Sequence, residues 1–149
     1  SDVYKRQAMN SSNTNSGGWT SCAMRSTHLP AILALMPTEI QNGIREVNKL
    51  TSAGSQSATI NTTADKLFLL SEVEIFGSTT YSEAGEGTQY DYYKAGNSKV
   101  KKRNGSAAGW WERSPYGSNS AHFCNVNGYG DAAYVNASGA IGVAFGFCF

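Results

Sequence analysis

The chain lacks several features that would assign it to a common functional class. No apolar run approaches the roughly 18 residues that a membrane-spanning helix needs. The formal net charge is only +1, and there is no basic stripe of the kind that binds nucleic-acid phosphates. The one basic cluster, residues 99–103, is typical of a solvated turn. We therefore expect neither membrane insertion nor nucleic-acid binding.

Cysteine and histidine are also scarce. The three cysteines are an odd number, too few for a disulfide framework, and neither they nor the two histidines have metal-site spacing. Cys124 and Cys148 each follow a phenylalanine in an expected strand, which favours a place in the core. A disulfide between them is the alternative. We expect no metal and no cofactor.

Motifs for catalysis are missing as well. The sequence contains no phosphate-binding loop, no dinucleotide fingerprint and no nucleophile elbow. Ser114, His122 and Asp131 can be combined into a triad on paper, but nothing in their spacing supports one. The acidic residues from 72 to 91 suit caps and loops better than a catalytic pair. These absences favour a protein that is not an enzyme.

What is present is a series of helical patterns followed by strand patterns. The expected helices are residues 21–35, capped by Ser21 and split by Pro30, a segment from Pro37 through Ile40, Ile44 and Val47, and the turns 72–76 and 86–94. The expected strands are 47–52, 58–62, the apolar run 66–70, 109–113, 122–127, 132–137 and 142–149. Short helices followed by a C-terminal antiparallel sheet predict the α+β class, and 149 residues fit one domain.

The apolar residues of these elements define the expected core. We expect burial of Leu67, Phe68, Leu69, Leu70, Trp110, Phe123, Val126, Val135, Val143 and Phe147. Trp110 and Trp111 must point to opposite faces of one strand. Arg113 follows Trp111 by two positions, and we expect it to pair with a carboxylate or a helix end.

Residues 1–18 are expected to lie outside the domain, which is assigned to 19–149. The first seven residues resemble a translated sequencing-adapter remnant, of the kind found at the ends of metagenomic reading frames. Residues 8–18 are mostly Asn, Ser, Thr and Gly, a composition typical of a disordered lead-in.

The segment 116–140 has an unusual composition. It contains no Lys, Glu, Gln, Met or Trp, and every residue type in it has a codon that ends in a pyrimidine. Asn codons randomised at their adenines would give this composition. Tyr, Ser, Gly and Asn are also the residues that antibody loops favour for binding. The alternative is an ordinary Gly- and Asn-rich run of hairpins, which requires the same turn residues.

Several landmarks occur in an order that resembles a known family. They are Gly17-Gly18-Trp19, Met24-Arg25, Val47-Asn48-Lys49, the run from Leu67 to Gly77, Glu86-Gly87-Thr88-Gln89-Tyr90, Trp110-Trp111 with Arg113-Ser114-Pro115, and the ending Gly142-Val143 to Phe147-Cys148. The chain resembles DUF6273, a family of bacterial and phage proteins common in gut Firmicutes, and the resemblance covers about residues 17–149.

The resemblance implies a C-type-lectin-like fold, the usual scaffold for variable proteins of diversity-generating retroelements. In such proteins adenine-directed mutagenesis rewrites a segment near the C-terminus, which agrees with the composition of 116–140. The fold normally closes with an N-terminal strand paired to the C-terminal one, and we expect that strand to be lost or altered here. Calcium-dependent sugar motifs are absent, so sugar binding is not implied.

The leading hypothesis is a non-enzymatic binding module on a virion or bacterial cell surface, with 116–140 presenting the surface for a protein or glycan ligand. The expected contact residues are Tyr116, Asn119, His122, Tyr129, Asp131, Tyr134 and Asn136. The three tyrosines should share one face with partly exposed rings, while Phe123 and Val126 face inward. The alternatives are an enzyme of the formylglycine-generating-enzyme-like fold, which needs a reactive cysteine, and a structural surface domain without a ligand.

Overall fold

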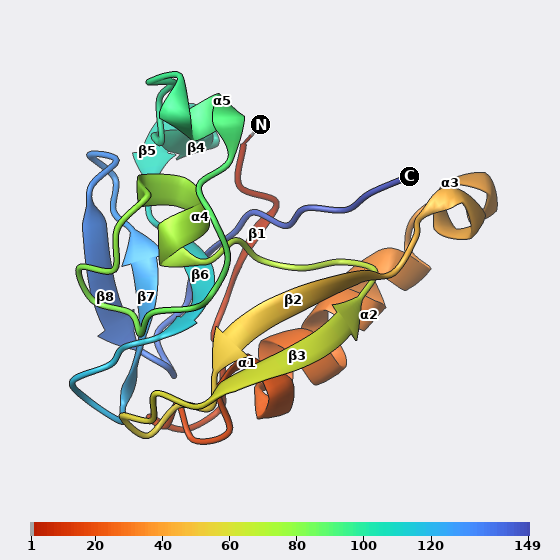
Figure 1. The fold of residues 1–149 in the computed structure, drawn as a ribbon. Coiled ribbons are helices and arrows are strands. Elements are labelled where there is room, and N and C mark those ends of the chain that lie inside the picture. The colour runs from red at the N-terminus through yellow and green to blue at the C-terminus, as the bar shows by residue number, and fades with distance from the viewer. Residues whose placement is uncertain (1) are drawn as a thin grey trace.

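The structure, a computed structural model, describes residues 2–149 and has the α+β architecture expected from the sequence (Figure 1). The helical elements are α1 (Gly18–Ser21), the π-helical turn η1 (Met24–His28), α2 (Leu29–Ala34), α3 (Thr38–Gly43), α4 (Glu72–Phe76) and α5 (Asp91–Lys94). The strands are β1 (Lys5–Gln7), β2 (Val47–Ser52), β3 (Ile60–Asp65), β4 (Lys101–Arg103), β5 (Ser106–Ala108), β6 (Trp110–Pro115), β7 (His122–Val126), β8 (Ala132–Asn136) and β9 (Ile141–Val143). Within the described part of the chain, no helix has the length and apolar character needed to cross a membrane.

A five-stranded sheet organises the molecule. Its strand order is β1–β9–β6–β7–β8, and the hairpins β2–β3 and β4–β5 form two separate small sheets. The pairs β6–β7, β7–β8 and β1–β9 are antiparallel, whereas β9 runs parallel to β6. β8 therefore lies at one edge of the sheet, and β1 lies at the other.

The prediction that residues 1–18 lie outside the domain is wrong for the residues that the structure describes. Residues 5–7 form β1, which pairs with β9, and Val3 and Met9 are buried. The indole nitrogen of Trp111 donates a hydrogen bond of 2.7 Å to the carbonyl of Gln7. The expected loss of the N-terminal strand is also wrong. All three residues of β1 are polar. They lack the alternation of apolar and polar residues that predicts a strand.

The two tryptophans of β6 lie in different apolar clusters, as their alternation predicts. Trp111 packs with Trp19, Leu69 and Phe123 and with other residues of α1, η1 and α2. Trp110 packs with the second cluster, Val3, Ile75, Tyr93 and Val126, beneath α4 and α5. Both indoles are fully buried. The main sheet is therefore covered on both faces.

The N-terminal helices differ in detail from the expected ones. Ser21 is the last residue of α1 rather than a cap. Pro30 has no N–H to donate to the preceding turn, and the turn directly before α2 is π-helical. Pro37 is the N-cap of α3 rather than its first residue, and α3 buries none of its side chains.

The remaining helices include one confirmed prediction and one partial one. Ser71 and Glu74 form the expected capping box at the start of α4. The helix expected at 86–94 is only α5, from Asp91 to Lys94.

Two apolar segments differ from the strands expected of them, because one forms no strand and the other forms only a short one. Leu67, Phe68 and Leu69 are buried as expected and Leu70 is half-buried, but this run makes only an isolated bridge, from Phe68 to Gly146. The last expected strand ends at Val143 instead of residue 149.

The chain beyond β9 also departs from the expected core. Phe147 is 39% exposed, so its predicted burial is wrong. Cys148 is exposed as well, and Cys22, Cys124 and Cys148 are all free thiols. The expected core position of Cys148 and the alternative disulfide are therefore both wrong.

Candidate ligand-binding surface

The segment 116–140 forms the free edge of the main sheet. It contains the β6–β7 loop, β7, the β7–β8 turn, β8 and the connection to β9. Within the described chain, β8 pairs only with β7. A substitution among its outward side chains can therefore disturb the pairing with no more than one neighbouring strand.

The β6–β7 loop is held by an asparagine outside the segment. Asn15 is fully buried, and its Nδ2 lies 2.8 Å from the carbonyl oxygen of Asn119, 2.7 Å from that of His122 and 3.4 Å from that of Tyr116. Its own amide donates to the carbonyl of Ser120 at 2.7 Å. All of these contacts are to the backbone of the loop, so they do not depend on which side chains the loop carries.

Other links to the rest of the fold use backbone as well. The amides of Met9 and Asn10 both donate to the carbonyl of Ala137, and the amide of Gly117 donates to the carbonyl of Tyr81 at 2.8 Å. One exception is Asn13, whose side chain accepts from the amide and hydroxyl of Ser138. The path of the segment is thus set partly by backbone contacts that do not depend on its side chains, and partly by the side chains of Asn119 and Asn127.

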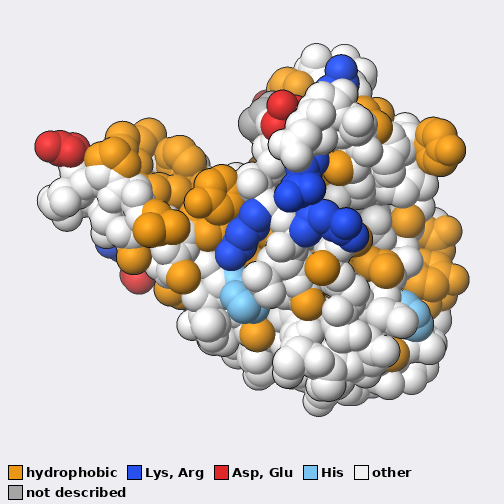
Figure 2. Space-filling model, turned by 180° about the vertical axis from the view of Figure 1, so that it is seen from behind, with side chains coloured by type: hydrophobic (Ala, Val, Ile, Leu, Met, Phe, Trp, Pro, Cys, Tyr) orange, Lys and Arg blue, Asp and Glu red, His pale blue; other side chains and the backbone are white. Residues whose placement is uncertain are grey.

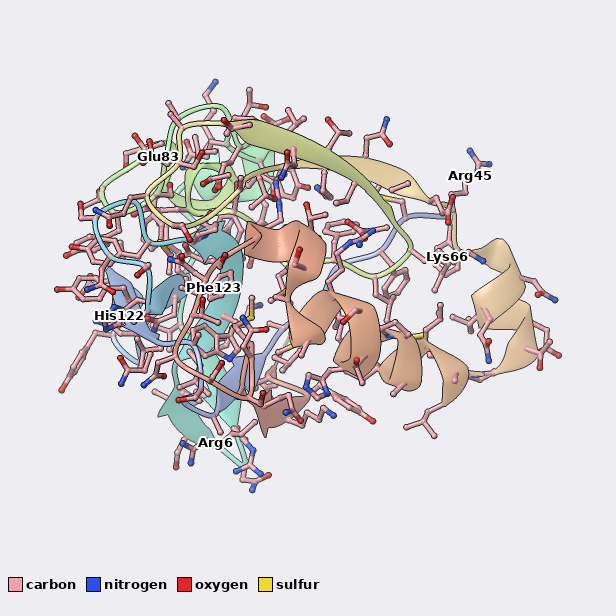
Figure 3. The ribbon with its side chains drawn as sticks, turned by 90° about the horizontal axis from the view of Figure 1, so that it is seen from below. Arg6, Arg45, Lys66, Glu83, His122 and Phe123 are labelled. Carbon is pink, nitrogen blue, oxygen red and sulfur yellow. The ribbon has the colours of Figure 1, made fainter. Side chains whose placement is uncertain are left out.

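Four rings gather on the outer surface of this edge. Tyr116 and Tyr134 are stacked, with centroids 4.2 Å apart and planes within 12°. His122 meets Tyr134 edge-on at 5.4 Å, and Tyr81 meets Tyr134 edge-on at 5.0 Å. Figure 3 shows that His122 and Phe123 lie at the same end of the molecule, far from Arg45 and Lys66. We call Tyr81, Tyr116, His122 and Tyr134 the aromatic cluster.

The structure divides the seven expected contact residues into two groups. Tyr116, His122 and Tyr134 belong to the aromatic cluster, and Asn119 and Asn136 lie beside it, since Asn119 Oδ1 is 2.9 Å from His122 Nδ1 and Asn136 pairs with His122. Asn119 Oδ1 also accepts from the amide of Ala121, so this side chain shapes the loop.

The second group lies at the opposite end of the β7–β8 hairpin. Tyr129 and Asp131 flank Gly130 in its turn, where Asn127 Oδ1 accepts both of their amides. Tyr129 is 88% exposed, and it is separated from the aromatic cluster by the length of the hairpin. The seven residues therefore do not make one continuous patch.

Phe123 and Val126 are both fully buried, as predicted, but on opposite faces of the sheet. Phe123 joins the cluster of Trp111, whereas Val126 joins that of Trp110. Two residues three positions apart in a strand with a period of two cannot share a face. Tyr134 lies on the face of the main sheet that α4 and α5 partly cover. This face of the sheet is open only toward the β6–β7 loop.

A buried ion-pair network anchors β6 to the rest of the fold. The guanidinium of Arg113 is bidentate to Glu74, at 2.6 and 3.1 Å, and also donates to the carbonyl oxygens of Leu50, Leu69 and Glu86. Burial would raise the pKa of Glu74, but the hydrogen bond and charge of Arg113, with the charge of Lys49, hold it below its ordinary value. The expected pairing of Arg113 with a carboxylate is confirmed, and Lys49 pairs with the same carboxylate at 3.0 Å.

Three further carboxyls are buried near this network. Glu72 accepts from the amides of Tyr81 and Ser82, and Glu86 accepts from Ser114 and from the amide of Ser52. Burial raises the pKa of Glu86 to about 7.

Glu112 is the most isolated of these carboxyls. It is fully buried, and neither of its oxygens has a hydrogen-bond partner. Burial and the nearby carboxyls of Glu72 and Glu86 raise its pKa well above the ordinary value. No group of His, Cys, Asp and Glu in the described chain has an arrangement that could hold a metal ion.

The buried thiols do not resemble activated nucleophiles. Burial raises the pKa of Cys22 to about 12. Burial and then the carboxyls of Glu112, Glu72 and Glu86 raise the pKa of Cys124 well above its ordinary value. A nucleophilic cysteine needs the opposite, a cation or helix end that stabilises the thiolate. The surroundings of both thiols therefore oppose cysteine chemistry.

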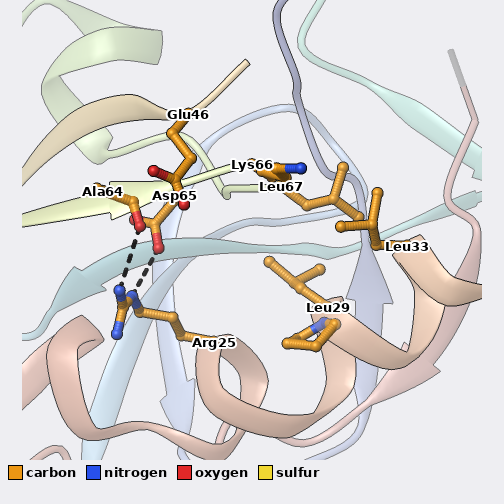
Figure 4. A pocket seen from close by; sticks show the side chains of 9 residues that line it. Arg25, Leu29, Leu33, Glu46, Ala64, Asp65, Lys66 and Leu67 are labelled. Carbon is orange, nitrogen blue, oxygen red and sulfur yellow. Dashed lines mark hydrogen bonds and ion pairs between the residues drawn. The ribbon is translucent and has the colours of Figure 1, made fainter. Parts of the chain in front are cut away.

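A small hollow of about 250 Å³ lies beside α2 and β3 (Figure 4). Leu29 and Leu33 line its apolar side, while Arg25 and Asp65 line its polar side. Arg25 Nε lies 2.6 Å from Asp65 Oδ1, so the two charges already satisfy each other. Glu46 and Lys66 also line the hollow.

The profile of the family described as "Domain of unknown function (DUF6273)" matches residues 1–148, and the chain belongs to this family. The match includes residues 1–16, which the sequence resemblance left out. No curated protein matches the chain. No solved structure matches it either.

Sequence reasoning missed two residues of the surface. Tyr81 lies in a Ser-, Thr- and Gly-rich loop outside 116–140, and an isolated tyrosine there gives no periodic signal. Asn15 was assigned to the disordered lead-in, where its composition matched that of its neighbours. Only the fold brings both residues to the segment 116–140.

Proposed function

We propose that this protein is a non-enzymatic binding module whose ligand surface is the aromatic cluster and the loop that carries it. The observation that best supports this proposal is the position of Asn15. Its side-chain nitrogen donates hydrogen bonds to three carbonyl oxygens of the loop. A loop held by its backbone keeps its path when its side chains change. A surface meant for diversification needs this property.

The chemistry of the cluster supports binding. Tyrosine gives large amphipathic contact area at a low cost in conformational entropy, and exposed tyrosines commonly dominate binding free energy. Tyr134 is 43% exposed, and Tyr116 and His122 are partly exposed. The composition of 116–140 supports diversification by adenine-directed mutagenesis, since all its residue types have codons ending in a pyrimidine.

We further propose a C-type-lectin-like scaffold. The pairing of β1 with β9 supports it, because that fold closes its sheet by joining an N-terminal strand to a C-terminal one. Under this proposal the ligand is a protein or glycan on a cell surface, and the module serves a virion or a bacterial surface. Fold class alone does not assign these roles.

Binding to cells tests the proposal directly. The fluorescently labelled protein would be titrated onto a panel of gut Firmicutes, and one or more strains should bind it saturably. Tyr116→Ser with Tyr134→Ser should weaken that binding at least tenfold, whereas Tyr92→Ser, on α5, should leave it unchanged. Equal binding by the cluster variant would reject the aromatic cluster as the ligand surface.

Sequencing of the locus tests diversification separately. A reverse transcriptase gene and a near-copy of the codons for 116–140 should lie beside the gene. Related isolates should differ at Tyr116, His122 and Tyr134 but keep Asn15 and Phe123. Substitutions spread evenly over the chain would contradict a diversified surface.

A further inference from the structure

The outer edge of β8 carries backbone groups that its partner strand does not use. Figure 1 shows β8 at the edge of the main sheet, and within the described chain it pairs only with β7. At the ends of this pairing, the amide of Ala137 donates to the carbonyl of Ala121, and the amide of Asn127 donates to the carbonyl of Asp131, both at 2.9 Å. Hydrogen-bonded residues alternate along an antiparallel pair, so the odd-numbered residues of β8 bond to β7. The even-numbered residues direct their amide and carbonyl groups away from β7: Ala132, Tyr134 and Asn136.

Most of these outward groups have no hydrogen-bond partner within the described residues. None is found for the amide or carbonyl of Ala132 or Tyr134, or for the amide of Asn136. The carbonyl of Asn136 accepts from the amide of Gly139 at 2.8 Å. A row of unpaired amides and carbonyls at the edge of a sheet can pair with another strand.

β8 also lacks the features that usually prevent such pairing. Edge strands are commonly protected by lysine, by proline or by a β-bulge. The sequence of β8 is Ala-Ala-Tyr-Val-Asn, and its register with β7 has no shift. The opposite edge strand, β1, carries Lys5 and Arg6. Of the two edges of the main sheet, β8 is therefore the one that its sequence leaves open to another strand.

We propose that β8 pairs antiparallel with β8 of a second copy of this chain, so that the two copies share one continuous sheet. The register places Tyr134 opposite the partner's Tyr134, and Ala132 opposite the partner's Asn136. Only this register brings all three outward residues of one copy opposite those of the other. Each such pair can exchange two backbone hydrogen bonds. The dimer does not depend on the function proposed for the aromatic cluster.

The charges and side chains of the edge suit this register. Asp131 is the only Asp, Glu, Lys or Arg in 116–140, and it lies opposite the partner's Ala137 rather than opposite its own copy. The two-fold axis is perpendicular to the sheet, so the same face points outward in both copies. The two Tyr134 rings are then neighbours, and aromatic cross-strand pairs stabilise a sheet. The dimer therefore presents both aromatic clusters on one face.

Sedimentation equilibrium from about 5 µM to about 1 mM tests the dimer. The mass should rise from 15.9 kDa toward twice that value. The affinity should be weak, because a strand of 5 residues buries less than the roughly 1,200 Å² of stable interfaces. Tyr134→Lys places two like charges opposite each other and should keep the protein monomeric. Tyr134→Glu should do the same, and an equimolar mixture of the two variants should form a dimer again.

Amide exchange followed by NMR identifies the strand that pairs. The amides of the outward residues, Ala132, Tyr134 and Asn136, should exchange at least twofold more slowly at the highest concentration than at the lowest. The amides of Ala133 and Val135 already bond to β7 and should not change. A dimer formed through any other surface would not give this alternation.

Two further variants keep the outcome decisive. Leu35→Ser with Phe149→Ser removes exposed apolar side chains at the ends of α2 and of the chain, and should leave the dimer unchanged. If thermal melting shows that Tyr134→Lys does not fold, Ala132→Pro removes only an outward amide and should weaken the dimer at least fivefold.

Several outcomes would overturn the proposal. A monomer at every concentration would leave the edge to a strand of another protein. A dimer that survives Tyr134→Lys, or that is lost in the variant of Leu35 and Phe149, would form through another surface. A mixture of the Lys and Glu variants that stays monomeric, or unchanged exchange of the outward amides, would equally rule out pairing through β8.

Discussion

At the scale of single residues, Arg113 joins β6 to several other parts of the fold. It is fully buried in β6 and donates to Glu74 of α4 and to the carbonyl oxygens of Leu50 in β2, Leu69 and Glu86. A bidentate arginine–carboxylate pair is directional, so it fixes the angle between these elements as well as their distance. The aromatic cluster lies on a sheet that this network holds in place.

Substitution of Arg113 should therefore be costly in a specific way. Arg113→Leu should lower the free energy of unfolding by about 3–5 kcal/mol, because Glu74 is left buried with only part of its partners. Glu74→Leu should lower the free energy of unfolding by a similar amount. The double variant should lower it by clearly less than the sum of the two single losses. Urea denaturation measures all three. Strict additivity would show that the pair is not coupled.

The buried carboxyls predict a dependence of stability on pH. The folded pKa values of Glu86 and Glu112 lie above the ordinary value of 4.5, and that of Glu86 reaches about 7. Their stabilising contribution to the free energy of unfolding is fully present below pH 4.5. It is lost as the pH rises through their pKa values in the folded protein. For Glu86 alone the loss is on the order of 3 kcal/mol. Glu74 has the opposite shift, so its contribution is lost only below pH 4.5.

Glu112→Gln removes one of these titrating groups. Its unfolding free energy should fall less between pH 4.5 and pH 9 than that of the unsubstituted protein, because no charge has to form in the core. Glu39→Gln, in the exposed helix α3, should keep the original profile. Urea denaturation across this range gives the curves. If Glu112→Gln and Glu39→Gln give the same profile, Glu112 does not titrate in the core.

At the scale of elements, β8 explains which side chains are free to vary. Tyr134 and Asn136 point outward beside His122, while Val135 packs against the cluster of Trp111. The alternation was predictable from the sequence, because a strand has a period of two. That α4 and α5 bury part of the outer face was not predictable, since no local pattern indicates which helix covers which face. Val126 is buried for this reason.

The exposed tyrosines of the hairpin should contribute little to stability. Replacing both Tyr129 and Tyr134 with Ala should change the free energy of unfolding by no more than about 1 kcal/mol. Thermal and urea denaturation measure the effect. The matched substitution Phe123→Ala should cost about 3–5 kcal/mol, since it leaves a cavity in the core. A large loss in the tyrosine variant would mean that these rings belong to the core.

At the scale of the whole molecule, strands near the two ends of the described chain, β1 and β9, lie side by side in the main sheet. Figure 2 shows the molecule from behind, with Lys and Arg side chains close together near the centre of the view and apolar side chains on the part that projects to the left. Arg6 of β1 and Arg103 of β4 line one hollow. Local patterns predicted the strands β2, β6, β7 and β8 but not β1, β4 or β5. The closure of β1 onto β9 depends on contacts between residues more than 130 positions apart.

Removal of residues 1–7 should therefore affect the whole domain. We expect a loss of more than about 2 kcal/mol, because Val3 leaves the core and β9 loses its partner. The Trp111 indole also loses the carbonyl of Gln7, so its fluorescence should shift to longer wavelength. Denaturation followed by tryptophan emission measures both effects. A truncated chain as stable as the full one would contradict the role assigned to β1.

The pairing of β1 with β9 also sets the order of events during synthesis. Residues 5–7 are translated early, but their partners at 141–143 follow on the order of ten seconds later at ordinary elongation rates. The amides of Met9 and Asn10 likewise cannot form their hydrogen bonds to the carbonyl of Ala137 until that residue has been translated. A nascent chain therefore cannot complete its sheet on the ribosome until β9 has emerged. Chaperones that shield exposed apolar segments should thus matter more for its yield than for that of a protein built from local contacts.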